Sequence, residues 1–350
     1  MAFHVSLQPS GHGFEVGDGE TVLEAALRKD LAFPYGCRNG ACGTCQGRVL
    51  SGGIDYRGPT PPGITPQEEA EGYALLCSAY PISNLVIEMR EIGAAKGIVV
   101  KTLPCRVTRM ERLAADVMRL FLKTPATERL QFLAGQYLDI LLRGGGRRSF
   151  SLANAPHEGE LLELHIRHVE GGRFSGHVFT EMKEKDLLRF QGPLGSFFLR
   201  EDSERPIIMV GGGTGFAPLK GMLEHAFHEG IERPIHLYRG ARALHDLYLH
   251  ELALDWAECR PDFHYTPVLS AADPEDDWGG RRGFVHEAVI EEYPDLSTHD
   301  IYMSGPPPMI EAAKRAFHEH GLPSEHLYYD SFAPARDSRP TAADRAWPYG

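Results

Sequence analysis

Four of the six cysteines are spaced so that they could bind an iron–sulfur cluster. Cys37, Cys42 and Cys45 follow a C-x4-C-x2-C pattern, and 31 residues separate Cys45 from Cys77. Such a cluster needs four thiolates that converge from one loop and one distant point of the chain. A structural zinc site is the alternative, but zinc usually takes C-x2-C pairs, which fits the x4 gap poorly. The loop also holds the small residues that folding around a cluster requires, namely Gly36, Gly40, Ala41, Gly43 and Thr44.

The segment Arg148-Ser149-Phe150-Ser151 resembles the R-x-Y-S signature of a flavin-binding reductase superfamily, and the resemblance implies that it holds a flavin. The arginine can meet a flavin phosphate with paired donors, and the aromatic ring of Phe150 can lie against the isoalloxazine ring. The hydroxyl of Ser151 can hydrogen-bond the N5 region, where a hydride arrives. Four residues make a short motif, and the alternative is a barrel strand whose arginine is satisfied by its neighbours.

The same resemblance implies that a second segment holds the flavin pyrophosphate. His165-Ile166-Arg167 belongs to an expected strand, and Gly171-Gly172-Arg173-Phe174-Ser175 follows it as a glycine pair and a helix start. Glycine lets the backbone approach a ligand closely, and the first N–H groups of a helix can bind an anion. We expect Ser175 to cap that helix and to donate to a phosphate.

Two further turns follow short apolar strands and could bind a nicotinamide coenzyme. The first is Gly211-Gly212-Gly213-Thr214-Gly215-Phe216-Ala217-Pro218, where glycines would let a pyrophosphate approach a helix N-terminus. It is not the G-x-G-x-x-G pattern, which argues against a simple alcohol dehydrogenase. The second is Ser304-Gly305-Pro306-Pro307-Pro308-Met309, for which a plain loop is the alternative.

The choice between NADH and NADPH depends on Tyr238-Arg239-Gly240-Ala241-Arg242, after the second strand of this part of the chain. Such a position normally faces the adenosine ribose. Arg239 and Arg242 could take a 2′-phosphate, so NADPH stays possible beside NADH, and arginines on a solvated loop are the alternative. Near the end of the chain, Phe332 could cover the flavin face, or the aromatic stretch Tyr328–Phe332 could belong to the core of the last strand.

The hydrophobic pattern divides the chain into parts that would position these residues. Residues 1–92 predict a small α+β domain with a helix over Thr21–Lys29, and residues 93–103 predict a linker. Residues 104–202 show strands broken by glycine and proline, which is typical of an antiparallel β-barrel, with one helix over Ser175–Met182. Residues 203–334 alternate strands and helices and predict a parallel sheet with helices on both faces, and residues 335–350 predict a tail.

The composition fits a cytoplasmic protein of several domains. The net charge of −12 argues against non-specific nucleic-acid binding, and no stretch approaches the roughly 20 apolar residues of a membrane span. No signal peptide is recognisable, so we expect a cytoplasmic location with reduced cysteines. Cys105 and Cys259, outside the loop, are predicted to be buried or incidental thiols. Residues 104–200 carry 15 bases against 11 acids, which suits an anionic ligand.

These motifs, in this order, carry a family resemblance. The cysteine segment resembles a plant-type ferredoxin domain of β-grasp fold. Residues 148–151 resemble the R-x-Y-S signature of the ferredoxin–NADP reductase superfamily, with Phe150 in place of Tyr. Residues 212–218 resemble its G-G-T-G-x-x-P motif, and residues 304–307 its C-G-P-P motif, with Ser304 in place of Cys. Over residues 1–334 the chain resembles the reductase components of bacterial oxygenases and the reductases of 3,6-dideoxyhexose biosynthesis.

The resemblance implies a Rossmann-like NAD(P) domain after an FAD barrel and a [2Fe–2S] domain. A hydride would pass from NADH, or NADPH, to FAD beside Ser151 and Ser304, and single electrons would leave through the cluster to an oxygenase or dehydrase component. One alternative is a stand-alone flavin or ferric reductase with a diffusible acceptor, against which the built-in cluster argues. Another is a non-enzymatic redox sensor, against which the hydride-transfer motifs argue.

Overall fold

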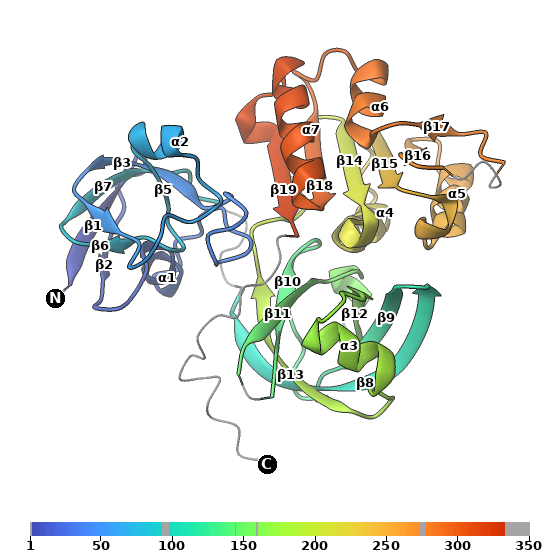
Figure 1. The fold of residues 1–350 in the computed structure, drawn as a ribbon, viewed down its shortest axis with the longest axis horizontal. Coiled ribbons are helices and arrows are strands. Elements are labelled where there is room, and N and C mark those ends of the chain that lie inside the picture. The colour runs from blue at the N-terminus through green and yellow to red at the C-terminus, as the bar shows by residue number, and fades with distance from the viewer. Residues whose placement is uncertain (1, 93–97, 144, 159, 273–276, 333–350) are drawn as a thin grey trace. The chain divides into compact units, whose positions relative to one another are not determined.

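The computed structural model describes residues 2–92, 98–143, 145–158, 160–272 and 277–332. The chain divides into two compact units, whose elements are labelled in Figure 1. Unit 1 contains the chain up to Val99 and the short segment Leu194–Phe197, and unit 2 contains Val100–Pro193 and Phe198–Phe332. Each unit has a hydrophobic core of its own.

Unit 1 is a mixed five-stranded sheet of order β2-β1-β7-β3-β5, with helix α1 packed against it. Alternation along β1 turns Val5 and Leu7 into the core, where they meet Val22 and Leu23 of α1. The predicted capping box at Thr21 opens this helix. The elements are β1 (Phe3–Gln8), β2 (Gly13–Val16), α1 (Val22–Arg28), β3 (Gln46–Ser51), β4 (Ile54–Asp55), α2 (Pro66–Ala70), β5 (Tyr73–Leu75), β6 (Tyr80–Pro81) and β7 (Leu85–Glu88).

The first part of unit 2 is a six-stranded barrel of order β11-β10-β13-β8-β9-β12. Its pairs β10–β11, β8–β13, β8–β9 and β9–β12 are antiparallel, as predicted. A bridge from Leu152 to Leu164 links the two ends of the sheet. The elements are β8 (Lys101–Ala114), β9 (Val117–Lys123), β10 (Tyr137–Leu141), β11 (Arg147–Ser151), β12 (Leu162–Arg167), α3 (Arg173–Thr180) and β13 (Leu187–Leu194).

The rest of unit 2 is a parallel sheet of order β17-β16-β15-β14-β18-β19, with helices on both faces. Ile208 and Val210 of β14 pack against α6 and α7 on one face, while Gly211 faces Leu219 of α4 on the other. The elements are β14 (Ile207–Gly212), α4 (Phe216–Glu229), β15 (Ile235–Ala241), α5 (His250–Cys259), β16 (Phe263–Leu269), β17 (Arg281–Arg282), α6 (Val285–Glu292), β18 (Asp300–Gly305), α7 (Pro307–Glu319) and β19 (Leu327–Ser331).

Two predicted boundaries differ from those in the structure, and two predicted segments lie partly or wholly outside its described residues. The last residues of the predicted linker, 101–103, belong to β8, because they pair with β13. The predicted helix over Ser175–Met182 begins and ends two residues earlier, as α3. Residues 93–97 of the linker and the predicted tail, 335–350, lie outside the described residues. Among the described residues, no helix is long and apolar enough to cross a membrane.

Candidate cluster, flavin and coenzyme sites

The four cysteines of the predicted cluster site come together in unit 1 as two pairs. Cys45 directly precedes β3 and Cys77 follows β5, and the pairing of these strands bonds the N–H of Leu76 to the carbonyl of Cys45 at 3.0 Å. A hydrogen bond from the Cys45 thiol lowers the pKa of Cys77. A hydrogen bond from the Cys42 thiol likewise lowers the pKa of Cys37 to about 7. Each thiol therefore has one close thiol neighbour.

This donor set fits a [2Fe–2S] cluster, in which four thiolates are shared between two irons. The N–H groups of Ala41 and Cys42 point to the sulfur of Cys37 at 3.4 and 3.3 Å, as they would to a thiolate ligand. The side-chain amide of Gln46 is buried without a partner and is free to donate to a cluster sulfur. Among the described residues, no three His, Cys, Asp or Glu side chains converge on one point, so the four thiols lie as two pairs and not as a closed four-ligand group.

Gly63 supports this loop, although the sequence analysis did not single it out. A Cβ at this position would lie 2.9 Å from backbone atoms of Gly40, Ala41 and Gly43 at once. Those atoms belong to the backbone and cannot rotate away, so only glycine allows the second loop to lie against the cysteine loop.

In unit 2, β11 carries the predicted flavin motif. Side chains alternate along a strand, so Arg148 and Phe150 share one face while Ser149 and Ser151 lie on the other. The ring of Phe150 lies 5.4 Å from the ring of Phe174 at the start of α3. The two predicted flavin segments are thus neighbours in the barrel.

A cavity of about 370 Å³ borders α3 next to this face. Residues of β10 and β13 line this half-open cavity, and β10 is the strand that pairs with the flavin strand β11. A basic and partly apolar lining suits an anionic aromatic ligand such as a dinucleotide. Except for Arg173, its basic residues were missed individually, although the basic surplus of residues 104–200 pointed to this part of the chain. These residues are Arg143, Arg173, His177 and Arg189.

Three residues predicted to bind FAD have side chains that are occupied within the protein. Ile166 belongs to the barrel core, and the ring of His165 is buried and bonded to Glu163 at 2.8 Å. The hydroxyl of Ser149 donates to the buried carboxylate of Asp139 at 2.6 Å. These three side chains are therefore not free to contact FAD, and a role of their backbone groups in binding it stays a prediction. A strand motif does not say which residues turn toward the interior.

The start of α3 is free to bind an anion, but Ser175 is not its cap. The N-cap is Gly172, which has no side chain to bond the first N–H groups of the helix. The hydroxyl of Ser175 instead accepts from the N–H of Val169 at 3.1 Å and closes the preceding turn. Gly171 lies in that turn with a φ of +71°.

The two predicted coenzyme turns meet at the C-terminal edge of the parallel sheet, because β14 and β18 are neighbours there. A Cβ on Gly215 would lie 1.9 Å from the carbonyl oxygen of Ser304, so no other residue fits. Helix α4 begins at Phe216 with neither a side-chain cap nor an acid in its first turn. Pro306 is the N-cap of α7, and Pro307 is its first residue.

The arginines near this edge differ in what they can reach. Arg242 is exposed and available to the adenosine ribose. Arg239 is 2% exposed and donates to the carbonyl of Tyr248 at 2.7 Å, so the prediction that it takes a 2′-phosphate directly is wrong. Arg167, predicted to bind FAD, pairs with Asp116, and a Cβ on Gly213 would lie 2.9 Å from its guanidinium. Arg167 therefore faces the coenzyme loop.

The two serines predicted to be catalytic are both neighbours of Asp330. The hydroxyl of Ser151 in the barrel donates to the Asp330 carboxylate at 3.4 Å. Asp330 is also the register partner of Ser304 in the β18–β19 pair. The hydroxyl of Ser304 is buried without a partner in the described chain. The sequence analysis noted Asp330 only as part of an aromatic stretch; its place at the end of the last strand was the available signal.

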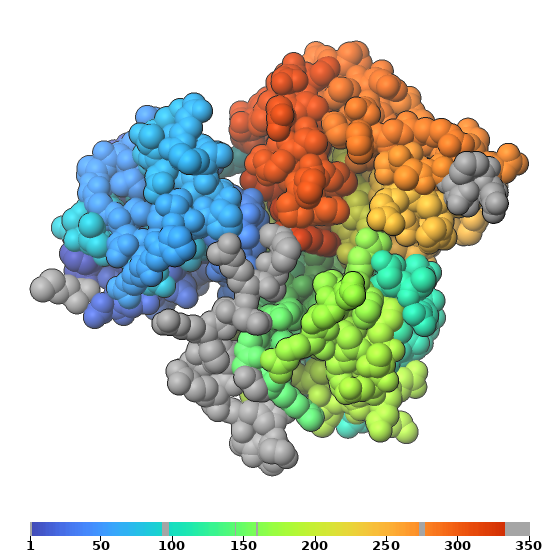
Figure 2. Space-filling view, in the orientation of Figure 1, coloured from blue at the N-terminus to red at the C-terminus, as the bar shows by residue number. Residues whose placement is uncertain are grey.

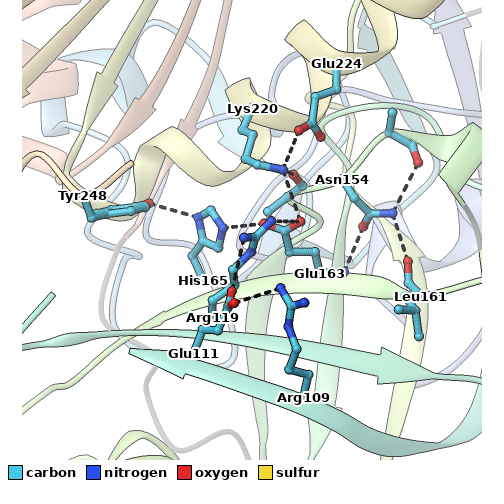
Figure 3. A network of polar contacts seen from close by, with 12 residues as sticks. Arg109, Glu111, Arg119, Asn154, Leu161, Glu163, His165, Lys220, Glu224 and Tyr248 are labelled. Atoms are coloured by element: carbon cyan, nitrogen blue, oxygen red, sulfur yellow. Dashed lines mark hydrogen bonds and ion pairs between the residues drawn. The ribbon is translucent and has the colours of Figure 1, made fainter. Parts of the chain in front are cut away.

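A buried ion network joins the barrel to α4, as Figure 3 shows. Lys220 of α4 donates to Glu163 of β12 at 3.2 Å and pairs with Glu224, one turn further along α4, at 2.7 Å. Lys220 also donates to the carbonyl of Ala153 at 3.1 Å, two residues beyond Ser151. The network therefore fixes the flavin strand against the helix that starts at the coenzyme loop. In Figure 2 these two parts of unit 2, green and yellow, lie against each other.

The charges in this network determine the ionisation of its acids. Burial alone would raise the pKa of Glu163, but the hydrogen bonds from His165 and Arg119 and the charge of Lys220 lower it to about 2. Burial raises the pKa of Glu224 to about 7. Burial lowers the pKa of His165, so its neutral ring donates to Glu163 and accepts from the hydroxyl of Tyr248 at 3.1 Å.

Comparison with known proteins finds matches along almost the whole chain. Residues 5–81 match the 2Fe-2S iron-sulfur cluster binding domain, residues 104–199 the oxidoreductase FAD-binding domain, and residues 209–315 the oxidoreductase NAD-binding domain. The predicted cluster cysteines, flavin motif and first coenzyme turn lie within these matches.

Individual relatives match the chain over at least 96% of their own length. The CDP-6-deoxy-L-threo-D-glycero-4-hexulose-3-dehydrase reductase of Yersinia pestis is 39% identical over 336 residues, which cover 96% of this chain and 100% of the relative. The phenol 2-monooxygenase reductase component DmpP of a Pseudomonas species is 34% identical over 342 residues, 96% of each chain. The crystal structure of the Amycolatopsis cytochrome P450 reductase GcoB matches with a TM-score of 0.76 and 35% identity, covering 95% of this chain and 99% of that one.

Proposed function

The chain belongs to the iron–sulfur flavoprotein reductases, which carry electrons from NADH to an oxygenase or dehydrase partner, and from this premise we propose that Ser151, Asp330 and Ser304 form its hydride-transfer site. The observation that carries this proposal is the hydrogen bond between Ser151 of the barrel and Asp330 of the parallel sheet, beside the buried hydroxyl of Ser304. Groups from the two parts of unit 2 meet at this point.

Bound FAD would accept a hydride and release single electrons, which a [2Fe–2S] cluster can relay one at a time. The protein's own groups bind and orient. Arg148 and the uncapped start of α3 hold phosphate oxygens, and Phe150 offers its ring to the flavin. The Asp330 carboxylate accepts the proton of Ser151, which orients the Ser151 hydroxyl oxygen toward the reacting edge. The unused hydroxyl of Ser304 orients the nicotinamide.

We propose that NADH is the preferred coenzyme. With Arg239 buried, Arg242 is the one exposed arginine in the stretch Tyr238–Arg242. One exposed arginine offers a 2′-phosphate fewer charged donors than the two that the sequence suggested, which favours the coenzyme without this phosphate. We place the protein in the cytoplasm, where NADH is available and where the six free cysteines stay reduced.

We propose a dehydrase component as the protein acceptor. The relative named for a dehydrase is 39% identical, against 34% for the phenol 2-monooxygenase component, and each aligns with 96% of this chain. An oxygenase component is the second candidate, which the likeness to the P450 reductase GcoB supports. Incubation of the reduced protein with each purified acceptor, followed by stopped-flow absorbance, distinguishes the two: the true acceptor reoxidises the cluster faster.

An anaerobic NADH titration followed by absorbance and low-temperature EPR tests the relay. We expect about three electron equivalents per chain, two for the flavin and one for the cluster, and a rhombic reduced [2Fe–2S] signal. Flavin bleaching in a cluster-loaded sample that gives no such signal would contradict the relay and favour a flavin reductase. No flavin reduction at all would favour a redox sensor.

The variant Cys42→Ser tests whether the cluster is the exit for electrons. We expect it to keep NADH-dependent reduction of ferricyanide, which can take electrons from FAD, and to lose reduction of the protein acceptor. Cys259→Ser is the matched control, because Cys259 is an exposed thiol outside the loop, and it should change neither activity. Acceptor reduction that survives in Cys42→Ser would disprove the cluster route.

A further inference from the structure

Arg239 is a buried cation with no acidic partner in the described chain. It lies near the C-terminal end of β15 and is 2% exposed. Its guanidinium sits 3.9 Å from the centre of the Phe216 ring and donates to the carbonyl of Tyr248 at 2.7 Å. The hydroxyl of Tyr265 is its other polar neighbour. All of these partners are neutral.

Such an arrangement is unfavourable in the absence of a counter-charge. Burial lowers the pKa of Arg239, but the ordinary pKa of arginine is so high that the group stays charged at neutral pH. A buried charge without a partner is normally lost in one of two ways: the residue is replaced during evolution, or a change of protonation neutralises it. Where the charge persists, an ion of opposite charge balances it. Because arginine does not lose its proton at neutral pH, an anion that balances the charge is the remaining explanation.

A second positive element lies directly beside Arg239. Phe216, on whose ring the guanidinium stacks, is the first residue of α4, and this end of the helix carries the positive end of its dipole. No side chain caps the helix, and no acid stands in its first turn. Gly213–Gly215 leads into it as a tight turn. Two positive elements therefore meet at the loop where the dinucleotide pyrophosphate is expected.

The aromatic cage keeps the charge in this place. Gly211 of β14 is the register partner of Arg239, so both project toward the α4 face of the sheet. Phe216 covers the guanidinium from α4, and Tyr248 covers it from the loop after β15, with its ring centre 5.0 Å away. Low-polarity surroundings exclude water, so the field of the charge is weakly screened toward the loop.

We propose that Arg239 is a positioning residue for the coenzyme: without touching it, the buried charge raises the affinity of the Gly213–Gly215 loop for the pyrophosphate. This rests on the proposed binding of NADH at that loop. The competing explanation is that Arg239 only fills space between β15 and α4. The two explanations differ in what a neutral side chain of similar length would do to the melting temperature of the protein without coenzyme. A positioning charge predicts no loss, whereas a packing role predicts a decrease.

The test is Arg239→Met in the full-length protein loaded with FAD and cluster. We expect the Kd for NAD⁺ and the KM for NADH to rise about tenfold, as loss of one charge interaction at an effective dielectric of about 20 would give, with kcat nearly unchanged. The melting temperature without coenzyme should stay the same or rise, because an unpaired buried charge is gone. Arg239→Lys, which keeps the charge, should restore most of the affinity.

A neutral hydride donor separates charge from geometry. N-benzyl dihydronicotinamide has no phosphate, so kcat/KM with this donor should be the same in Arg239→Met and in the wild type. Arg260→Met is the matched control, since Arg260 also stacks on a phenylalanine, Phe227, but is exposed; it should leave NADH kinetics unchanged. Arg239→Gln replaces the methionine variant if that does not fold, with the same expected pattern.

Several outcomes would overturn the inference. They are a lower melting temperature with unchanged NAD⁺ affinity, equal losses with NADH and with the neutral donor, or failure of both neutral variants to fold while Arg239→Lys folds. Each would make Arg239 a packing residue. A wild-type protein that does not bind NAD⁺ at all would instead contradict the proposed function, so the two failures can be told apart.

Discussion

At the residue scale, the contact between Ser151 and Asp330 connects positions that are 179 residues apart in the chain. Ser151 ends β11 of the barrel, and Asp330 lies in β19, the edge strand of the parallel sheet. The hydrogen bond gives the serine hydroxyl one orientation, and a hydroxyl held in this way can present its oxygen consistently to a reacting group.

We expect Asp330→Asn to slow flavin reduction by NADH by about 100-fold, the range typical of a lost proton-handling or orienting group, while NAD⁺ binding stays near normal. Stopped-flow absorbance of the flavin measures the rate. Asp255→Asn, which changes an exposed acid of α5, should leave it unchanged. An Asp330→Asn protein with a wild-type rate would remove Asp330 from the site.

The sequence predicts residue roles best where they depend on local spacing. The cysteine pattern singled out four thiols that the fold brings together as two pairs, and three of them share one loop. It could not show that Arg239 is buried, because this depends on Tyr248 and Phe216, which fold over it from other segments. It could not identify Asp330 as the partner of Ser151 either, because nothing local to β19 reveals the barrel.

At the element scale, helix α4 connects the coenzyme loop with the buried ion network. Its first turn faces the coenzyme loop, and its second turn carries Lys220, the centre of the buried network with Glu163 and Glu224. Because Lys220 also holds the carbonyl of Ala153, a shift of α4 would be transmitted to the end of the flavin strand.

We expect Glu163→Gln to destabilise the protein by about 3–5 kcal/mol at pH 7, the usual cost of removing one partner from a buried ion pair. The low pKa of Glu163, about 2, means that its stabilisation is present above the ordinary carboxyl pKa and is lost as the pH falls through the folded value. Urea unfolding at pH 7 and at pH 3 measures this. A penalty of equal size at both pH values would contradict the ionic explanation.

We expect the stability of Glu224→Gln to depend on pH in the opposite direction to that of Glu163→Gln. Burial raises the pKa of Glu224 to about 7 in the folded protein. The protonated carboxyl therefore contributes fully to stability below the pKa of the unfolded chain, and this contribution is lost as the pH rises through the pKa of the folded protein. Glutamine resembles the protonated acid at every pH. The variant should therefore match the wild type near pH 5 and be more stable at pH 8, as thermal unfolding at the two pH values would show. Greater instability at pH 8 would show that the bond to Lys220 outweighs burial.

Element boundaries were predicted where a cap is local and missed where it is not. The Thr21–Glu24 capping box located the start of α1. At α3 the serine preference for caps pointed to Ser175, whereas Gly172 takes that position because the turn before it is closed by the Ser175 hydroxyl. The first residues of β8 were assigned to a linker because their strand character comes from pairing with β13.

At the scale of the whole molecule, the two units have separate cores, and each holds different cofactor residues. The core of unit 1 includes Cys45 and Cys77 among its buried side chains. The barrel and the parallel sheet of unit 2 have cores of their own, joined by the network around Lys220.

We therefore expect at least two unfolding transitions in scanning calorimetry. Removal of iron should lower only the transition of unit 1, because the cysteine loop is part of its core. Addition of FAD or NAD⁺ should raise only the transition of unit 2, by mass action. A single transition that moves as a whole with either cofactor would show that the units unfold together.

The three-part organisation could be predicted because each part has its own hydrophobic period: mixed in residues 1–92, two-residue alternation in the barrel, and strand–helix alternation afterwards. The hydrophobic period does not show that Leu194–Phe197, at the end of β13, belongs to unit 1. That assignment depends on contacts between segments more than a hundred positions apart.

The exposure of Cys259 gives this protein a natural attachment point for a fluorophore. Cys105 lies in the barrel core, where burial raises its pKa to about 12 and suppresses the reactive thiolate. In the loaded protein the other four thiols would be bound to iron, which leaves Cys259, at the end of α5, for a maleimide dye. One dye per molecule would then report an intact preparation, and a higher dye-to-protein ratio would count the molecules that have lost their iron.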